Sequence, residues 1–424
     1  MSIKKRELVL SAAVVAITAT VVAVTGVSQA FFRESPKEVV DEVWQIINYQ
    51  YVDATFNQTD WREVRREYLD KSYANKEEAY AAIREMLEKL EDPYTRFMTP
   101  EEFKNMQIDT SGELTGVGIQ ITKDEETNKI IVIAPIEESP AFEAGILPRD
   151  IITKIDGKST EGMEIDDAVN LIRGKPGTVV TITIQREAKE VDYPLTRAKI
   201  EIHPVKARLE ETSVGKIGYI RLNQFSAQAS EEMAAAIKEF EEQQVAGYIL
   251  DLRSNPGGLL YSSVEIARMF IEQGTIVSTV DRVGGGEIHQ ANNGALTDKP
   301  LVVLVDGGSA SASEILSGAL QDHQRAVLVG AKTFGKGLVQ SVRGLGDGSG
   351  LAVTISKYLT PNGRDINKEG IPPDVVLELT KEQLKQLQSD RTKIGTQEDP
   401  QFVLGLEVLG KKIQETSEAA AVAN

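Results

Sequence analysis

The order of hydrophobic and polar positions changes character several times along the chain. Between residues 36 and 106, apolar residues recur at intervals of three and four, beginning with Val39, Val43 and Ile47. This spacing is typical of amphipathic helices and predicts a small helical module over residues 31–110. After Gly112, short apolar runs alternate with polar turns, a pattern typical of strands.

Residues 111–200 contain several short strands and two helical turns. The expected strands are 116–121, 130–133, 150–155 and 179–185, and the longer helix is 166–172. Strands of this length, bounded by glycine and by polar residues, predict one compact domain.

Residues 201–380 alternate buried strands with helices. Strands are expected at 218–222, 247–252, 301–305 and 338–342, and helices at 230–243, 259–270 and 313–320. The alternation predicts βαβ crossovers and a mainly parallel sheet, with functional sites at the carboxyl ends of its strands. Residues 381–424 are polar and predict a C-terminal helical tail. The fold class is therefore multidomain α/β.

The N-terminus has the pattern of an export sequence. Basic residues at 4–6 precede the uncharged run 8–27, and small residues follow at 28–30, where a signal peptidase cleaves. The run is also long enough to cross a bilayer, which takes about 20 residues. Residues 1–30 are predicted to be a signal peptide or a membrane anchor, and the protein is expected to be exported.

The amino-acid composition excludes several kinds of partner and of catalytic chemistry. The formal net charge of −17 opposes binding to phosphate backbones, so no nucleic-acid partner is expected. The absence of cysteine excludes disulfides, thiolate metal sites and cysteine nucleophiles, and three histidines are too few for a histidine cage. We expect no metal and no cofactor.

A serine-rich turn is the first candidate for catalysis. Residues 306–314 follow a buried strand and open a helix, so that backbone N–H groups at the helix start would lie beside the Ser311 hydroxyl and could stabilise an oxyanion. The turn lacks the second glycine of the Gly-x-Ser-x-Gly elbow. A serine that only caps the helix is the competing interpretation.

The serine would need a base. His323 lies on the same predicted helix and is expected to point away. Lys336, between Gly335 and Gly337, could act as the base if its apolar setting lowers its pKa. Residues 330–336 also fit the start of a phosphate-binding loop, but Gly337 stands where that loop requires Ser or Thr, so we reject nucleotide binding.

The turn formed by Gly116, Val117, Gly118 and Ile119 could bind a carboxylate through its backbone N–H groups. Together with the glycines that follow it, the segment 112–198 resembles a PDZ domain of the kind found in bacterial proteases. PDZ domains bind the free C-termini of other proteins, so the resemblance implies peptide binding. A structural turn without a ligand is the alternative.

Three ordered motifs behind that domain, residues 251–258, 308–314 and 333–340, resemble the carboxy-terminal processing (tail-specific) proteases. The resemblance covers nearly the whole chain after residue 30. It implies a Ser–Lys protease core over residues 201–380.

Residue by residue, the resemblance implies these roles. Ser311 is the nucleophile, Lys336 the general base and Gln340 the residue that orients the lysine. The backbone N–H groups of Gly257 and Ala312 form the oxyanion hole.

The resemblance also implies a regulatory residue and partners. Arg173 is the candidate for the PDZ arginine that senses bound peptide, whereas Arg253 and Glu314 match family positions that we interpret as structural ion pairs. The expected substrates are exported proteins with free apolar C-termini, in the periplasm or the thylakoid lumen. Some relatives dimerise through their terminal helices. A catalytically silent PDZ adaptor or chaperone is the alternative function.

Overall fold

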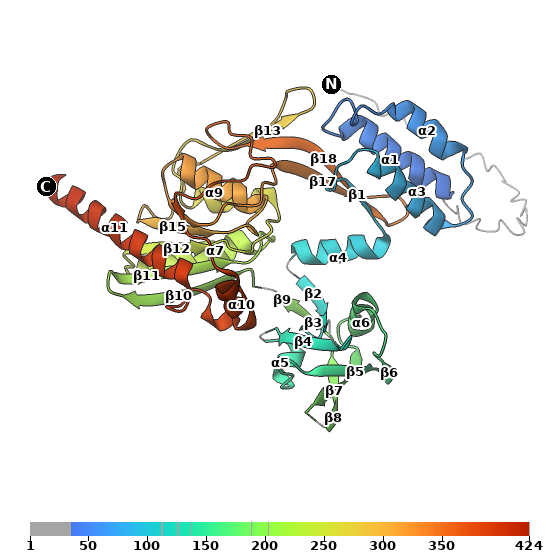
Figure 1. The fold of residues 1–424 in the computed structure, drawn as a ribbon, viewed down its shortest axis with the longest axis horizontal. Helices are drawn as coiled ribbons and strands as arrows, with labels where there is room; N and C mark the ends of the chain where they lie inside the picture. Colours follow the sequence, from blue (N-terminus) through green and yellow to red (C-terminus); the bar gives the residue numbers. More distant parts are fainter. Residues whose placement is uncertain are drawn as a thin grey trace, which may run out of the picture.

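The computed structural model describes residues 35–111, 113–124, 127–136, 138–187, 189–201 and 203–423. The leader predicted at residues 1–30 lies outside this part of the chain. The described residues form a helical module, a PDZ-like domain and a larger α/β core (Figure 1). No described helix is both long enough and apolar enough to cross a membrane.

The helical module confirms the periodicity of the sequence. It contains helices α1 (Pro36–Gln50), α2 (Trp61–Asp70) and α3 (Lys76–Glu88). Ser35, Asp60 and Asn75 cap them, each accepting a hydrogen bond from a backbone N–H of the first turn. The module's core also takes in apolar side chains from residues 345–353, so the module packs on the distant hairpin of strands β17 (Leu338–Gly344) and β18 (Gly350–Leu359).

A short strand and a helix lead from this module to the next domain. Strand β1 (Arg96–Met98) pairs with β18, and helix α4 (Pro100–Ser111) follows it. Figure 1 shows α4 between the helical module and the PDZ-like domain. The Phe103 ring of α4 lies on the backbone of Gly344 and Gly350, where an added Cβ would come within 3.2 and 2.3 Å of the ring, respectively.

The PDZ-like domain is built on a six-stranded antiparallel sheet in the order β3-β4-β5-β7-β8, with β6 beside β5. Its elements are β2 (Glu113–Gly116), β3 (Ile119–Lys123), β4 (Ile130–Pro135), α5 (Pro140–Glu143), β5 (Ile151–Ile155), β6 (Lys158–Ser159), α6 (Ile165–Ile172), β7 (Val179–Arg186), β8 (Lys189–Thr196) and β9 (Ala198–Glu201). Strand β8 was not predicted from the sequence.

The strand predicted at 116–121 is two strands. Strand β2 ends at Gly116 and pairs with β9, whereas β3 starts at Ile119 and pairs with β4. Between them Gly118 has φ 76°, and a Cβ there would lie 2.2 Å from Ser139 Cβ. Glycine therefore allows the tight turn that the carboxylate-binding hypothesis requires.

The central sheet of the α/β core has the order β10-β11-β12-β15-β16-β19, parallel except for the β10–β11 pair. Its strands are β10 (Val205–Thr212), β11 (Gly215–Leu222), β12 (Gly247–Asp251), β15 (Leu301–Val305), β16 (Val327–Gly330) and β19 (Val375–Val376). Helices α7 (Ala229–Glu242), α8 (Leu260–Arg268) and α9 (Ala312–Asp322) cover one face. The predicted parallel sheet is confirmed.

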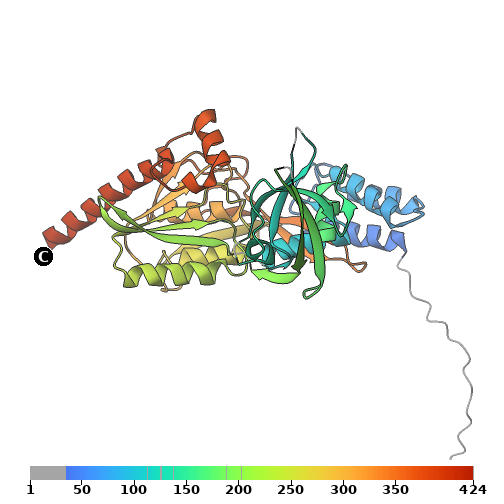
Figure 2. The same ribbon diagram turned by 90° about the horizontal axis from the view of Figure 1, so that it is seen from below.

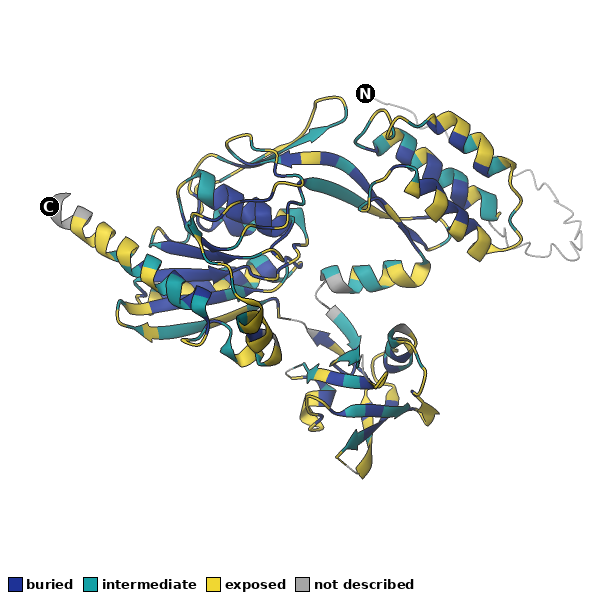
Figure 3. Ribbon diagram, in the orientation of Figure 1, coloured by how far each residue is buried: buried dark blue, intermediate teal, exposed yellow. Residues whose placement is uncertain are grey.

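The opposite face is covered by the last helix, α11 (Pro400–Ala423), whose Phe402 and Leu409 are buried against it. It follows α10 (Lys381–Ser389) and a short 3-10 turn, η1 (Arg391–Lys393). Figure 2 shows α7 and α11 on opposite sides of the sheet. The first half of α11 is thus part of the core, whereas residues 411–418 are mostly exposed (Figure 3).

A second sheet, which the sequence did not predict, extends from the core to the helical module. It contains β13 (Thr275–Asp281), β14 (Ile288–Gln290), β17 (Leu338–Gly344), β18 (Gly350–Leu359) and β1. All its pairings are antiparallel. The long β17–β18 hairpin extends from the core to the helical module (Figure 1), and residues 336–340 lie at the start of β17, at the end opposite the turn.

Candidate active site

Ser311 lies directly before α9, at the carboxyl end of β15. Its φ of 55° and ψ of −113° are rare for a residue with a side chain, and such a conformation costs of order 1–3 kcal/mol. Backbone strain of this kind often accompanies function, because surrounding contacts must hold it in place. The strain therefore supports Ser311 as a functional residue.

The neighbouring serines are engaged in structural contacts. Ser309 and Ser313 are fully buried, and their hydroxyls donate to the carbonyl oxygens of Leu252 and Asn255 at 2.8 and 2.9 Å. Ser311 is partly exposed. Of the three serines, Ser311 is the one that a substrate could reach.

The Glu314 carboxylate joins the serine turn to the lysine segment. Its Oε2 accepts hydrogen bonds from the backbone N–H groups of Ser311 and Lys336, both at 2.9 Å. Its Oε1 accepts from the Thr333 hydroxyl at 2.6 Å and from the Gly335 N–H at 2.7 Å. Glu314 is fully buried, so the ion-pair interpretation is wrong for this residue: its described hydrogen-bond partners are N–H and O–H groups.

Tyr358 of β18 makes a second connection between the two segments. Its hydroxyl lies 2.5 Å from the Lys336 carbonyl oxygen and 3.2 Å from that of Ser311. The ring is buried, and burial raises the pKa of Tyr358 well above its ordinary value, so the hydroxyl keeps the proton that it donates. Glu314 and Tyr358 together fix the backbones of Ser311 and Lys336 relative to each other.

The surroundings of Lys336 favour its neutral form. Burial lowers the pKa of its amine, and the nearby Arg96 guanidinium lowers it further, whereas the carboxylates of Asp92 and Glu314 act in the opposite direction. The net shift is downward from the usual lysine value. A lysine with a lowered pKa can act as a general base.

Gln340 lies on β17 opposite Thr354 of β18, beside a register shift in the pairing. A β-bulge at such a place re-aims the side chains next to it. Among the described residues, the buried Nε2 atom of Gln340 has no hydrogen-bond partner. Within the same part of the chain, no hydrogen bond joins the side chains of Ser311 and Lys336; catalytic hydrogen bonds are often long or poorly aligned in enzymes without bound substrate.

The two residues predicted for the oxyanion hole lie together beside Ser311. A Cβ on Gly257 would be 2.9 Å from the amide nitrogen of Ala312 and 2.9 Å from Ser311 Cβ. Ala312 is the first residue of α9, where N–H groups have no intrahelical acceptor. The Gly257 N–H donates to Asn255 Oδ1 at 2.9 Å, so it would have to turn away to bind an oxyanion.

Arg253 forms the structural ion pair that the sequence suggested. Its guanidinium contacts the carboxylates of Asp251 at 2.6 Å and Asp399 at 2.7 Å, and all three side chains are buried. Burial alone would raise the pKa of Asp251, but the charge and hydrogen bonds of Arg253, together with Arg221 and Tyr219, outweigh burial and hold that pKa at about 2. This network fixes the loop after β12 to the start of α11.

Other predicted residues lie elsewhere. The Arg173 guanidinium donates to Asn105 of α4, which links the PDZ-like domain to that helix. His323 ends α9, with Nε2 2.7 Å from the Thr275 carbonyl oxygen, in agreement with its predicted place away from the serine. No group of metal-ligating side chains occurs among the described residues.

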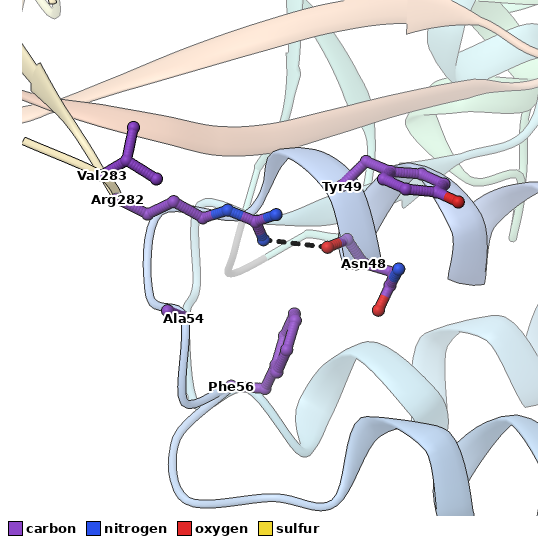
Figure 4. A pocket seen from close by; sticks show the side chains of 6 residues that line it. All are labelled: Asn48, Tyr49, Ala54, Phe56, Arg282 and Val283. Carbon is purple, nitrogen blue, oxygen red and sulfur yellow. Dashed lines mark hydrogen bonds between the residues drawn. The ribbon is translucent and has the colours of Figure 1, made fainter. Parts of the chain in front are cut away.

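A pocket of about 350 Å³ lies between the end of α1 and the β13–β14 hairpin (Figure 4). It is lined by Asn48, Tyr49, Ala54, Phe56, Arg282 and Val283. Arg282 donates to the Asn48 carbonyl oxygen at 2.8 Å. None of the predicted catalytic residues lines this pocket.

The sequence did not identify the roles of Glu314 and Tyr358. Apart from the bond of Glu314 to the nearby Ser311 N–H, both act through residues that lie far away along the chain, and no local pattern encodes such contacts. Glu314 had one usable signal: it is a glutamate in the first turn of a helix, where a carboxylate can accept a hydrogen bond from the capping residue.

The fold and the site together define a class. The chain combines a PDZ-like domain with an α/β core whose partly exposed serine opens a helix beside a lysine of lowered pKa, the arrangement of a PDZ-containing hydrolase. Residues 216–377 match peptidase family S41, and residues 131–186 match the PDZ domain.

Known proteins similar to the chain are carboxyl-terminal-processing proteases. One from Synechocystis sp. is 50% identical over 350 residues, 82% of each chain. The chloroplastic carboxyl-terminal-processing peptidase 2 of Arabidopsis thaliana is 41% identical over 78% of this chain and 67% of that protein. A solved photosystem II D1 C-terminal processing protease is 37% identical and has a TM-score of 0.57. The match covers 81% of this chain and 93% of the solved chain. The chain belongs to the carboxyl-terminal-processing proteases of peptidase family S41, and is a hydrolase with a PDZ domain.

Proposed function

We propose that the protein is a serine endopeptidase with a Ser311–Lys336 dyad that cleaves the C-terminal tails of exported proteins. The observation that carries the proposal is the pair of hydrogen bonds from the Ser311 and Lys336 N–H groups to one oxygen of Glu314, both at 2.9 Å. They hold a partly exposed serine next to a lysine whose pKa is lowered.

In the proposed mechanism, neutral Lys336 takes the Ser311 proton as the hydroxyl attacks a peptide carbonyl. The protonated lysine then gives that proton to the leaving amine, and water releases the acyl group by the same path in reverse. Gln340, whose buried amide nitrogen has no hydrogen-bond partner among the described residues, would turn to orient the Lys336 amine.

The N–H of Ala312, at the N-terminus of α9, would donate to the oxyanion of the tetrahedral intermediate. The Gly257 N–H would join it after leaving Asn255 Oδ1. Losing one donor of an oxyanion hole typically slows the reaction by about 100–1000-fold.

The PDZ domain would select the tail. Strand β3 lies at the edge of its sheet and α6 packs against it, so an extended peptide could add to that edge. Gly116, Val117, Gly118 and Ile119 would bind the terminal carboxylate. Half-buried apolar side chains of β3 and α6 would line the path of the peptide; they are Ile119, Ile121 and Leu171. An apolar tail fits this lining.

The proposed location follows from the leader and the relatives. Residues 1–30 would direct export, either cleaved or retained as a membrane attachment. Similarity to a chloroplastic peptidase and to a photosystem II D1 processing protease supports the thylakoid lumen, with the periplasm as the alternative compartment. A homodimer through the terminal helices is part of the proposal.

The test compares the chain from Phe31 onward with its Ser311→Ala and Lys336→Ala variants. Each is incubated with unfolded proteins that carry either apolar or charged C-termini, and the products are sized by mass spectrometry. The proposal expects cleavage by the wild type alone, with a preference for apolar tails.

Cleavage by the Ser311→Ala variant at the wild-type rate would refute the dyad. If every form bound apolar tails and none cut them, the PDZ adaptor or chaperone would replace the peptidase. Equal cleavage of apolar and charged tails would refute the proposed tail preference.

A further inference from the structure

A loop of the N-terminal helical module lies at the catalytic lysine. The Tyr94 ring faces Lys336, with Nζ 4.8 Å from the ring centroid. Tyr94 belongs to the segment between α3 and β1, more than two hundred residues before Lys336 in the sequence. The two residues meet because β1 pairs with β18, the strand that also pairs with β17.

We propose that residues 92–96 form one wall of the active site, with Tyr94 as a positioning residue that keeps the Lys336 amine out of bulk water. The proposal deepens the function above and rests on Lys336 being the base. It also gives the helical module a part in catalysis.

The loop is held rigidly in place. Asp92 accepts hydrogen bonds from the Tyr94 N–H at 2.9 Å and from the Thr95 hydroxyl at 2.7 Å. The Thr95 oxygen in turn accepts from the Thr354 N–H at 3.0 Å, and both threonines are buried. Since Thr354 is the cross-strand partner of Gln340, the loop is attached next to the residue proposed to orient the lysine.

Two effects of the ring oppose each other. Attraction between an ammonium group and an aromatic face stabilises the charged lysine, and at accessible sites it raises the pKa by less than about one unit. Exclusion of water disfavours the charged lysine, and for buried groups this effect reaches several units. Burial is the larger influence on Lys336, so the ring acts mainly as a shield.

The charges around the amine come from two elements. The loop brings the Arg96 guanidinium, which lowers the pKa of Lys336, and the Asp92 carboxylate, which raises it. Helix α9 brings Glu314, which also raises it. From β18, Tyr358 keeps its proton and donates a hydrogen bond to the Lys336 carbonyl oxygen. Arg96 is exposed and can be replaced without opening the core.

The pKa of Lys336 determines where the rate falls at low pH. The base must be neutral, so the rate falls as the pH drops below the pKa of Lys336. Opening the wall with Tyr94→Ser admits water and raises that pKa, which moves the acid limb of kcat/KM to higher pH by about one unit, with the rate recovering at high pH. Tyr94→Phe keeps the ring, so its acid limb of kcat/KM should lie at the wild-type pH.

Replacing the loop cation gives an independent test. Arg96→Gln should move the acid limb to higher pH by about half a unit, whereas Arg96→Lys, which keeps the charge, should leave it in place. Tail-peptide binding by the PDZ domain and the melting temperature show that each variant is folded. If Tyr94→Ser does not fold, the comparison of Arg96→Gln with Arg96→Lys still tests the inference.

A second readout needs no turnover. In the Ser311→Ala background, acetylation of Lys336 by acetic anhydride, measured by mass spectrometry across pH, reports the free amine. Tyr94→Ser should shift this curve to higher pH. Unshifted labelling curves and acid limbs in both Tyr94→Ser and Arg96→Gln would overturn the inference, as would a uniform loss of rate at every pH. The proposed function fails separately, if Lys336→Ala cleaves like the wild type.

Discussion

At the scale of single residues, the site depends on a few buried groups that fix the backbone around Ser311 and Lys336. Glu314 alone accepts four hydrogen bonds, two of them from these residues. A carboxylate is the side chain suited to this place, because both of its oxygens accept and neither donates.

We therefore expect Glu314→Gln to reduce kcat/KM by about 10–100-fold. The amide would turn its NH₂ group toward N–H donors on one side, and each buried unsatisfied group costs about 1–3 kcal/mol. Steady-state cleavage of a tail substrate measures the loss. Glu415→Gln, at an exposed position of α11, is the matched control. Full activity in Glu314→Gln would show that the carboxylate does not fix the site.

At the scale of elements, the β17–β18 hairpin connects the segment of Lys336, the helical module and α4. The Phe103 ring of α4 lies on the glycines at the base of the hairpin turn, Gly344 and Gly350. These glycines are required by the close approach of the ring.

Adding a methyl group at Gly350 should therefore destabilise the protein. The new Cβ would lie 2.3 Å from the Phe103 ring, and overpacking of this kind typically costs about 1–3 kcal/mol. Gly344→Ala, with 3.2 Å to the ring, should cost less. Chemical denaturation of the two variants measures the difference. Equal stability of Gly350→Ala and the wild type would contradict the described packing.

The hydrophobic pattern was sufficient to predict most helices and strands of the α/β core. It predicted the buried strands β12 and β15 and the helices α7, α8 and α9 nearly to the residue, because their apolar periodicity is strong. It did not predict the antiparallel sheet, whose β1–β18 pairing joins Arg96 to Ala352. Pairings over such sequence distances leave no local signal. For the same reason the contacts of Tyr94 and Tyr358 were not foreseen, whereas short motifs were enough to single out Ser311 and Lys336 as candidates.

At the scale of the whole molecule, ion pairs and helices join segments that are distant in the sequence. The Arg253 network connects the loop after β12 to the beginning of α11, whose first half covers the central sheet. Helix α4 contacts the hairpin through Phe103 and the PDZ domain through Asn105.

Replacing Arg253 by methionine should cost about 3–5 kcal/mol, because the buried carboxylates of Asp251 and Asp399 lose their ion pairs at 2.6 and 2.7 Å, while Arg221 stays 3.7 Å from Asp251. Adding Asp251→Asn and Asp399→Asn should recover part of the loss. Urea unfolding of the single and triple variants measures both effects. A single variant as stable as the wild type would refute the network's role.

The same network predicts how stability depends on pH. The pKa of Asp251 is about 2 in the folded protein, below the usual aspartate value near 4. The stability that ionised Asp251 contributes is therefore fully present above about pH 4 and is lost as the pH falls toward 2. Melting temperatures between pH 2 and 6 should drop more in the wild type than in a variant with Arg253→Met, Asp251→Asn and Asp399→Asn. Parallel profiles would contradict the assignment.

The central claim is that the Lys336 amine is the base for Ser311, and the absence of cysteine allows a direct test. Lys336→Cys introduces a single thiol, which 2-bromoethylamine converts into a lysine analogue with a sulfur in its chain. The account predicts that Lys336→Cys loses about 100–10,000-fold in rate and that aminoethylation restores cleavage, with an acid limb at lower pH because sulfur lowers the pKa of the amine. Cleavage by unmodified Lys336→Cys at the wild-type rate, or no recovery after complete aminoethylation of the folded variant, would contradict it.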